Sequence, residues 1–322
     1  MKKTIKIKFS GFWPEFQENN NFIYNTLKKK YDVILSDSPE YLFSSCFSDE
    51  YLKYDCVRIF YTGENLCPDF NLFDYAIGYE YIDFGDRYLR FPNYAMSEVY
   101  GKDVDLMLKK HLNNENILKD KPEFCSFVVS KGEGYVAKER EAFFYLLSKY
   151  KKVESGGRFL NNIGCPEGIQ DKLLFQMKHK FSIAFENSSH EGYSTEKIVQ
   201  SFAAKTIPIY WGDPQIGRIF NENAFVNCNA FNSFNEIVKK IKEIDSDNEL
   251  FMKMMSTPAL NDMSYVKKCQ SDLQLFLENI IDTDIENGYR RDTVGYGKKK
   301  EDELKDSLKR KKKTIWNMMG LR

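Results

Sequence analysis

A chain of 322 residues is long enough for two domains of ordinary size, and its 26 Phe and 20 Tyr provide ample apolar material for packed cores. The 47 basic and 47 acidic residues cancel, which argues against a partner recognised by overall charge, such as nucleic acid. Seven scattered cysteines without a CxxC pair exclude a disulfide framework and a cysteine zinc site. They predict reduced, mostly buried thiols in a cytosolic protein.

The N-terminal sequence MKKTIKIKFSGFW does not have the pattern of a signal peptide. Lys6 and Lys8 interrupt the place where an apolar region would stand, so we expect a first strand instead. No stretch approaches the ~20 apolar residues needed to cross a bilayer. We therefore expect a cytoplasmic protein whose body stays on one side of any membrane.

The first part of the chain alternates short apolar runs with one amphipathic helical stretch. Expected elements are a strand at 4–9, a helix at 22–30, strands at 31–35, 41–45 and 73–79, and a strand that becomes a loop within 57–65. This rhythm favours a parallel sheet with crossover helices. The polar stretch 102–121 interrupts it and is predicted to be helix and linker.

The rhythm restarts after that linker. Expected elements are strands at 124–130, 152–155, 181–187, 206–212 and 224–231, and helices at 140–150, 194–204, 233–256 and 264–280. We predict an α/β fold of two Rossmann-like, doubly wound domains, 1–120 and 121–290, followed by a tail at 291–322. Ligands are expected in a cleft between the domains, at the carboxyl ends of the strands.

The segment 181–212, FSIAFENSSHEGYSTEKIVQSFAAKTIPIYWG, carries the densest pattern of reactive side chains. An apolar strand ends in a polar Glu-Asn pair, and a helix then begins with Ser194 or Thr195 as its expected N-cap. A helix N-terminus offers free N–H groups and partial positive charge to a phosphate. Lys197 adds a full charge in the first turn, although a solvated surface turn would fit the same pattern.

The motifs FEN, GYSTEK and IPIYWG, in that order, resemble the donor-binding signature of glycosyltransferase family 10, the α-1,3/α-1,4-fucosyltransferases. The resemblance extends to FYTGEN at 60–65, to 70–90 and to REAFFYLLSKYKKVESGGRFLNNIG at 140–164, and covers roughly residues 4–280. It is greatest to bacterial α-1,3-fucosyltransferases. It implies the GT-B arrangement, in which the first domain binds the acceptor and the second binds the sugar nucleotide.

The resemblance also implies roles for particular residues. Glu64 in YTGEN matches the carboxylate proposed as catalytic base. The positions that hold the phosphates, ribose and fucose of GDP-fucose are matched by Arg140, Asn187, Tyr193, Glu196 and Lys197. Upstream of Arg140 this chain reads SKGEGYVAKE, where bacterial relatives tend to have a proline before the arginine, so the local loop differs.

These residue types suit inverting fucosyl transfer. The acceptor hydroxyl attacks as GDP departs from the opposite face through an oxocarbenium-like transition state, so one carboxylate is needed to take the proton. GDP leaves as an anion that requires positive charge, which Arg140 and Lys197 can supply. The family resemblance implies transfer of L-fucose to the 3-OH of GlcNAc in N-acetyllactosamine-type acceptors, giving Lewis X-type glycans.

Two alternatives stay open at this point. One is an α-1,4 linkage or another acceptor on the same fold, and the other is a non-catalytic protein that binds sugar nucleotides or glycans. Glu64 in a strand-end loop could also be a plain exposed residue.

No essential metal is expected. The three D-x-D tripeptides, which begin at Asp103, Asp245 and Asp282, are interpreted as surface because none follows an apolar strand. His111 and His179 are expected to be exposed.

The tail 298–322 carries ten Lys or Arg against four Asp or Glu, a net charge of +6. Its apolar residues recur near a helical period: Leu304, Leu308, Ile315, Trp316 and Met319. A basic amphipathic helix can lie on an anionic membrane surface, and some bacterial family members are thought to dock on the inner membrane in this way. A solvated charged tail is the alternative.

Overall fold

The computed structural model describes residues 2–110, 117–132 and 138–318, with side chains as far as residue 310. The chain divides into two compact units. The first comprises Met1–Gly78, Ile82–Phe91 and Ser271–Arg322, and the second Tyr79–Tyr81 and Pro92–Gln270. The first unit is therefore built from both ends of the chain. The boundaries expected from the sequence, at residues 120 and 290, fall inside these units.

The first unit is organised around a six-stranded, all-parallel sheet with the order β2-β1-β3-β4-β5-β6. Its strands are β1 (Thr4–Ser10), β2 (Asp32–Leu35), β3 (Tyr41–Ser44), β4 (Val57–Tyr61), β5 (Tyr75–Gly78) and β6 (Tyr88–Arg90). Strands β3, β4 and β5 are buried throughout, and their sequences are mostly apolar apart from the buried Arg58 in β4. The sequence did not predict β6, whose three residues are too short for a pattern.

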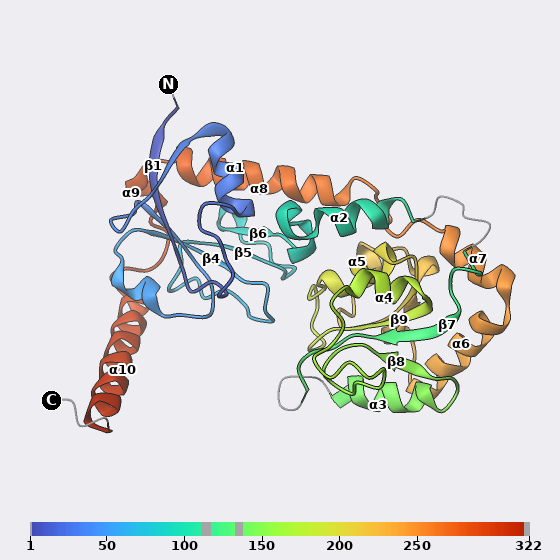
Figure 1. The fold of residues 1–322 in the computed structure, drawn as a ribbon. Helices are drawn as coiled ribbons and strands as arrows, with labels where there is room; N and C mark the ends of the chain where they lie inside the picture. The colour runs from blue at the N-terminus through green and yellow to red at the C-terminus, as the bar shows by residue number, and fades with distance from the viewer. Residues whose placement is uncertain (1, 111–116, 133–137, 319–322) are drawn as a thin grey trace. The chain divides into compact units, whose positions relative to one another are not determined.

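The helices of the first unit come mostly from the C-terminal part of the chain (Figure 1). They are α1 (Phe22–Lys30), α8 (Tyr265–Asp282, which crosses the unit boundary), α9 (Ile285–Gly288) and α10 (Tyr296–Met318), with short 3-10 turns at Glu50–Lys53 and Gly85–Arg87. Helix α1 spans the residues predicted for it. Asn21 caps it by accepting from the N–H groups of Ile23 and Tyr24.

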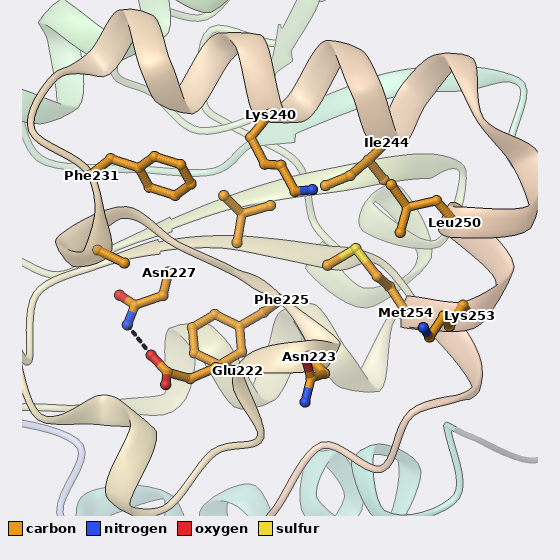
Figure 2. A pocket seen from close by; sticks show the side chains of 12 residues that line it. Glu222, Asn223, Phe225, Asn227, Phe231, Lys240, Ile244, Leu250, Lys253 and Met254 are labelled. Atoms are coloured by element: carbon orange, nitrogen blue, oxygen red, sulfur yellow. Dashed lines mark hydrogen bonds between the residues drawn. The ribbon is translucent and has the colours of Figure 1, made fainter.

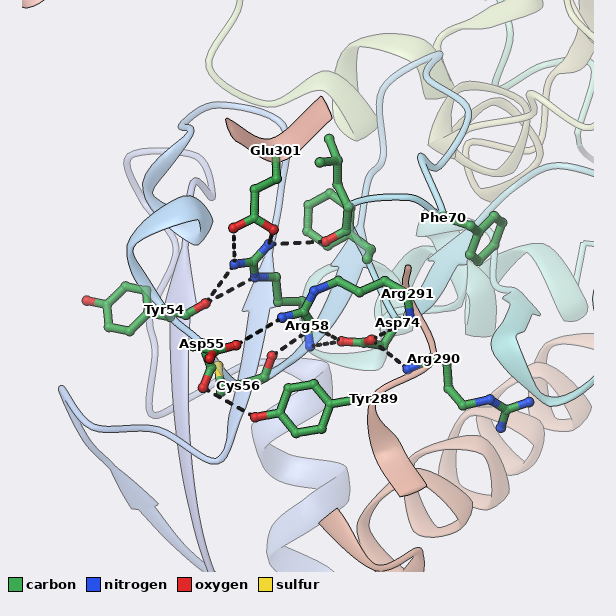
Figure 3. A network of polar contacts seen from close by, with 12 residues as sticks. Tyr54, Asp55, Cys56, Arg58, Phe70, Asp74, Tyr289, Arg290, Arg291 and Glu301 are labelled. Carbon is green, nitrogen blue, oxygen red and sulfur yellow. Dashed lines mark hydrogen bonds and ion pairs between the residues drawn. The ribbon is translucent and has the colours of Figure 1, made fainter. Parts of the chain in front are cut away.

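A buried polar network joins the C-terminal segment to this sheet (Figure 3). The carboxylate of Asp74 is fully buried and accepts from the backbone N–H groups of Arg58, Arg290 and Arg291 at 2.8, 2.7 and 2.9 Å. It also forms an ion pair with the Arg291 guanidinium. The buried guanidinium of Arg58 donates to both oxygens of Glu301 in α10, at 2.9 and 3.1 Å. The early part of α10 is thus part of the first unit.

Two apolar residues of the predicted tail have a packing role. Leu304 and Leu308 pack, partly buried, against the hydrophobic cluster that contains Phe60 and Phe73. The side chains of Ile315 and Trp316, and all of Met319, lie outside the described residues. No helix in the described part of the chain is both long and apolar enough to cross a membrane.

The second unit contains a five-stranded, all-parallel sheet with the order β11-β10-β9-β7-β8. Its strands are β7 (Glu123–Phe127), β8 (Val153–Ser155), β9 (His179–Phe185), β10 (Ile207–Trp211) and β11 (Val226–Asn227). The chain passes from β7 to β8 on one side and then to β9 on the other, so the order reverses between β7 and β9. In open parallel sheets, ligands bind at the carboxyl ends of the strands at such a reversal.

Several helices belong to this unit. They are α2 (Ser97–Leu108), α3 (Lys138–Ser148), α4 (Lys172–Met177), α5 (Glu196–Ala203), α6 (Phe234–Ser246) and α7 (Asn248–Ser256), with 3-10 turns at Asn93–Ala95, Ile216–Arg218, Glu222–Ala224 and Cys228–Ala230. Both sheets agree with the predicted α/β class. The sequence did not predict α4, and α2 begins five residues before the stretch predicted for it.

Two predicted elements of the second unit were wrong in extent. The single helix expected at 233–256 is broken at Asp247, whose side chain accepts from the N–H groups of Glu249 and Leu250 and so caps α7. The strand expected at 224–231 has only two residues, because the Glu222–Ala224 and Cys228–Ala230 turns flank it closely.

Candidate active site

The donor-binding residues expected from the sequence gather at the carboxyl edge of the second sheet. Asn187 lies two residues beyond the end of β9, Glu196 and Lys197 open α5, and Arg140 lies in the first turn of α3. Tyr193 precedes α5 in the loop. These five residues belong to one unit and lie around the strand-order reversal between β7 and β9. Residues far apart in the sequence are therefore brought to one place.

Arg140 is held by the end of β9. Its guanidinium is buried and donates through Nε and Nη2 to the carbonyl oxygen of Phe185, at 3.1 and 2.5 Å. Nη2 also donates to Asn187 Oδ1 at 2.9 Å. Within the described residues, these bonds leave the two N–H groups of Nη1 for a ligand. Burial lowers the pKa of Arg140, and the charge of Glu186 opposes this effect.

Glu186 occupies the centre of the site, although the sequence interpretation gave it no role. Its carboxylate is fully buried and accepts from the Thr195 N–H and hydroxyl groups, both at 2.7 Å. Lys197 Nζ lies 3.0 Å from the same carboxylate. Burial lowers the pKa of Lys197, but the charges of Glu186 and Glu196 outweigh burial, and the pKa stands above its ordinary value.

Glu196 is the second carboxylate of the site. It accepts from Asn93 Nδ2 at 2.9 Å and lies 3.3 Å from Lys197 Nζ. Burial raises its pKa, but the nearby Lys197 and Lys172 outweigh that effect and lower the pKa to about 2. Burial also lowers the pKa of Lys172 to about 8, against the influence of Glu196. Glu196 and Lys197 are thus partners in a charge cluster and not a solvated surface turn.

No side chain of the described residues caps the start of α5. Thr195 occupies the N-cap position, as one of the two predicted candidates, but its hydroxyl donates to Glu186 and forms no cap bond with the helix. The hydroxyl of Ser194 is buried, and no residue of the described ranges forms a hydrogen bond with it. An uncapped helix N-terminus beside Lys197 is a suitable seat for phosphate oxygens.

Tyr193 is packed rather than exposed. Its ring is buried and meets the ring of Tyr79 edge-on at 5.0 Å between centroids. Gly192 precedes it with φ of +83°, and a side chain there would lie 2.5 Å from the Tyr79 carbonyl oxygen. This glycine lets the loop approach the backbone of Tyr79 closely.

Glu64, the expected base, belongs to the first unit. It lies three residues beyond the carboxyl end of β4, and its side chain is exposed. Its backbone N–H donates to Thr62 Oγ1 at 3.0 Å, which fixes the turn. The position at the carboxyl edge of a parallel sheet is the one expected of a residue that meets substrate.

Three residues of the site were missed from the sequence: Asn93, Lys172 and Glu186. Only Glu186 carried a local signal, since a carboxylate directly after a buried strand stands at the ligand-binding edge. Asn93 and Lys172 have no motif around them. Their partners are more than 20 residues away, and a linear pattern does not reveal such contacts.

Two expectations about other polar residues were wrong. His179 is fully buried as the first residue of β9, where Nδ1 lies 2.9 Å from the Phe175 carbonyl oxygen and Nε2 lies 3.2 Å from Glu154. Asp245, expected at the surface, is buried and forms ion pairs with Lys151 and Lys180. His111 lies outside the described residues. Among the described residues, no three His, Cys, Asp or Glu side chains group in a way that could hold a metal ion.

An apolar cavity of about 390 Å³ lies elsewhere in the second unit (Figure 2). It is lined by residues of β11, α6 and α7 and their connections, among them Phe225, Ile244, Leu250 and Met254. Its lining also includes Lys240 and Lys253, but none of the residues expected to bind the donor.

The chain matches two family models. The model of the alpha-(1,3)-fucosyltransferase FucT N-terminal domain covers residues 7–97, and that of the glycosyltransferase family 10 (fucosyltransferase) C-terminal region covers residues 118–268. The chain is 30% identical to the alpha-(1,3)-fucosyltransferase FucT of Helicobacter pylori over an alignment of 322 positions, which covers 87% of this chain and 66% of that protein. The chain therefore belongs to glycosyltransferase family 10, the fucosyltransferases.

Two further similarities concern the solved structures and an animal relative. A crystal structure of an α1,3-fucosyltransferase with GDP-fucose matches with a TM-score of 0.72 and 28% identity, and covers 88% of this chain and 93% of that one. The mouse 4-galactosyl-N-acetylglucosaminide 3-alpha-L-fucosyltransferase 9 is 35% identical over 117 residues, which are 35% of this chain. The chain thus spans 66% of the Helicobacter protein's length and 31% of the mouse protein's length.

Proposed function

We propose that this chain transfers L-fucose from GDP-fucose to a sugar hydroxyl, with inversion at the anomeric carbon. The observation that carries the proposal is the cationic cluster of Arg140 and Lys197 at the open N-terminus of α5. It stands at the strand-order reversal of the second sheet, where a diphosphate is expected. The match to a solved fucosyltransferase that holds GDP-fucose supports the same ligand.

In the proposed mechanism, the second unit holds the leaving group. Nη1 of Arg140 and the ammonium of Lys197 bind the oxygens of GDP, and the free N–H groups of α5 add partial positive charge. As the fucose–phosphate bond lengthens, negative charge develops on GDP, and these fixed donors stabilise it. Asn187 positions Arg140 through their hydrogen bond. No general acid is required, because GDP departs as an anion.

Glu64 is proposed as the general base that takes the proton of the acceptor hydroxyl. The exposed carboxylate at the carboxyl edge of the first sheet and the match of YTGEN to the family motif support this role. The acceptor is proposed to be the 3-OH of GlcNAc in N-acetyllactosamine-type chains. The names of the Helicobacter and mouse relatives support 3-linked transfer.

The test is GDP release from GDP-fucose, measured with and without N-acetyllactosamine. Transfer predicts release that depends on the acceptor, and NMR of the product would show the linkage. Glu64→Ala should abolish transfer, with a loss of roughly 100-fold or more, while GDP affinity stays unchanged. A near-normal rate would remove Glu64 from its role. No acceptor-dependent release across a panel of glycans would favour the alternative, a protein that only binds sugar nucleotides.

The basic end of α10 is proposed to lie on an anionic membrane surface, which would place a cytoplasmic enzyme peripherally on the inner membrane. The net charge of +6 in residues 298–322 supports this. Flotation with vesicles that contain anionic lipid should retain the full chain and lose a chain that ends after Arg310. A cut at residue 295 is unsuitable, because it also removes Glu301. Equal flotation of both chains would contradict the proposal.

A further inference from the structure

We infer that Glu186 is a positioning residue that holds Lys197 in place and in its charged form for the diphosphate of the donor. The inference rests on the proposed function, since it assigns Lys197 to that ligand. No contact of Glu186 with substrate is invoked, because its carboxylate is fully buried and faces α5.

The carboxylate of Glu186 contacts the N-cap residue and the first turn of α5. One oxygen accepts from the backbone N–H of Thr195, and the other accepts from its hydroxyl and lies 3.0 Å from Lys197 Nζ. The same hydroxyl accepts from Lys197 Nζ at 2.9 Å. Carboxylate, hydroxyl and ammonium therefore form a closed triangle that fixes both the residue before the helix and the cation within it.

The neighbouring strand makes room for this carboxylate. Gly212 follows β10, and a Cβ atom there would lie 2.4 Å from Cγ of Glu186 and 2.7 Å from its Cβ. Gly212 also has φ of +153°, a conformation that residues with side chains rarely adopt. The backbone of Glu186 is fixed as well, since its N–H donates to the Trp211 carbonyl oxygen at 2.8 Å. The site is thus built around a side chain of this size and charge.

The charge around Lys197 depends on this residue. The charged groups that face its ammonium are Glu186 from the end of β9, Glu196 from α5 itself, Arg140 from α3 and Lys172 from α4. Without Glu186, Glu196 would remain as the one carboxylate of this group, and Lys197 would face it together with two other cations, Arg140 and Lys172, in a buried setting. Burial would then favour the neutral amine of Lys197.

The experiment measures the protonation of each lysine separately. Acetic anhydride labels neutral amines, so labelling across a pH series, read by mass spectrometry, reports on Lys197 and Lys172 individually. In the unaltered protein, Lys197 should become reactive at a higher pH than Lys172. In Glu186→Gln, which keeps the volume of the side chain, the half-reaction of Lys197 should move below pH 9, toward the pKa of about 8 that burial gives Lys172. GDP affinity at pH 9 should then fall by roughly tenfold, with a smaller loss at pH 7.

Gly212→Ala provides a second route to the same effect, because it displaces the carboxylate without removing it. The matched control is Asp245→Asn, another buried carboxylate paired with lysines in the same unit. It should change the labelling of Lys151, whose pKa is raised by its hydrogen bond to Asp245, and leave Lys197 and GDP affinity unaltered. An unchanged Lys197 profile in Glu186→Gln would overturn the inference. The inference would also be overturned if, in the unaltered protein, Lys197 reached half-reaction at the same pH as Lys172 or at a lower pH. This second test does not depend on whether the variants fold. If the unaltered protein did not bind GDP, that result would instead contradict the proposed function.

Discussion

At the scale of single residues, the candidate site is held together by charges that already have partners in the protein. Arg140 bonds to the carbonyl oxygen of Phe185, and Lys197 lies against two carboxylates. Such groups need little rearrangement when a ligand arrives, and fixed dipoles and charges are the main source of transition-state stabilisation in many enzymes. The planar guanidinium of Arg140 is the clearest case, since it bonds to protein with one side and leaves Nη1 for phosphate.

Arg140→Lys should therefore impair donor binding although the charge is kept. A lysine ammonium cannot bond in the geometry of the guanidinium fork to Phe185, Asn187 and a phosphate together. We expect the KM for GDP-fucose to rise by roughly tenfold, with a fall in kcat. Arg218→Lys, an exposed arginine of the same unit, is the control and should leave both constants unaltered. If the Arg140→Lys variant had the same KM and kcat as the parent, the guanidinium geometry of Arg140 would not be needed for donor binding.

Glu196 should make the stability of the protein depend on pH. Its pKa in the folded state is about 2, below the ordinary value of 4.5, so its stabilising contribution is present above about pH 4.5 and is lost as the pH falls toward 2. Urea unfolding of the parent and of Glu196→Gln between pH 3 and 7 checks this. The free energy of unfolding of the parent should exceed that of Glu196→Gln by an amount that grows with pH. This difference should reach on the order of 2 kcal/mol and level off above pH 5. A difference independent of pH would contradict the charge cluster.

At the scale of elements, α10 combines two roles within one helix. Its first turns belong to the fold through Glu301, Leu304 and Leu308, whereas the residues from 311 onward carry the tail's run of lysines. The sequence predicted one amphipathic tail because the apolar residues continue with the same period throughout. The period alone does not reveal whether protein or another surface covers those residues.

Chains ended at two positions should separate these roles. A chain that ends at residue 295 leaves the buried guanidinium of Arg58 without Glu301, and the loss of one partner from such a pair costs about 3–5 kcal/mol. A chain that ends at residue 310 keeps the pair and should unfold with nearly the parent's midpoint. Thermal or urea unfolding of both chains is the measurement. Similar midpoints for the two shortened chains would mean that α10 is not part of the fold.

Elements with a strong apolar pattern were predictable from the sequence. The helix at 22–30 and the strands β1, β9 and β10 lie within two residues of their expected ends, because their burial follows the period of the element. The short extent of β11 was not predictable, because turns occupy most of the apolar run at 224–231. The break at Asp247 was also missed. The break depends on the hydrogen bonds by which Asp247 caps α7. The spacing of the apolar residues does not change at this position, so it gives no sign of the break.

The candidate site was predictable only in part. The five residues expected to bind the donor were singled out through motifs, and the structure brings them together in one unit. Glu186 was passed over because the same position suits an unremarkable polar residue at a strand end. Its significance comes from Thr195 and Gly212, and these contacts depend on how β9, β10 and α5 pack.

At the scale of the whole molecule, GDP should stabilise one unit selectively. All expected GDP-binding residues belong to the second unit, so hydrogen exchange of segments 181–187 and 194–204 should slow when GDP is added. GDP at 100 times its Kd stabilises the unit that binds it by about 2.7 kcal/mol. The strands of the first unit, within 4–61, should keep their exchange rates. Protection confined to the first unit would place the nucleotide elsewhere.

The discontinuous first unit has a consequence for synthesis on the ribosome. When residue 91 has emerged, Asp74 still lacks the N–H groups of Arg290 and Arg291, and Arg58 lacks Glu301. The second unit, almost entirely contiguous at 92–270, can mature meanwhile. The N-terminal sheet therefore cannot complete these contacts until residues 290–301 have been translated. We expect the second unit to complete its fold before the first.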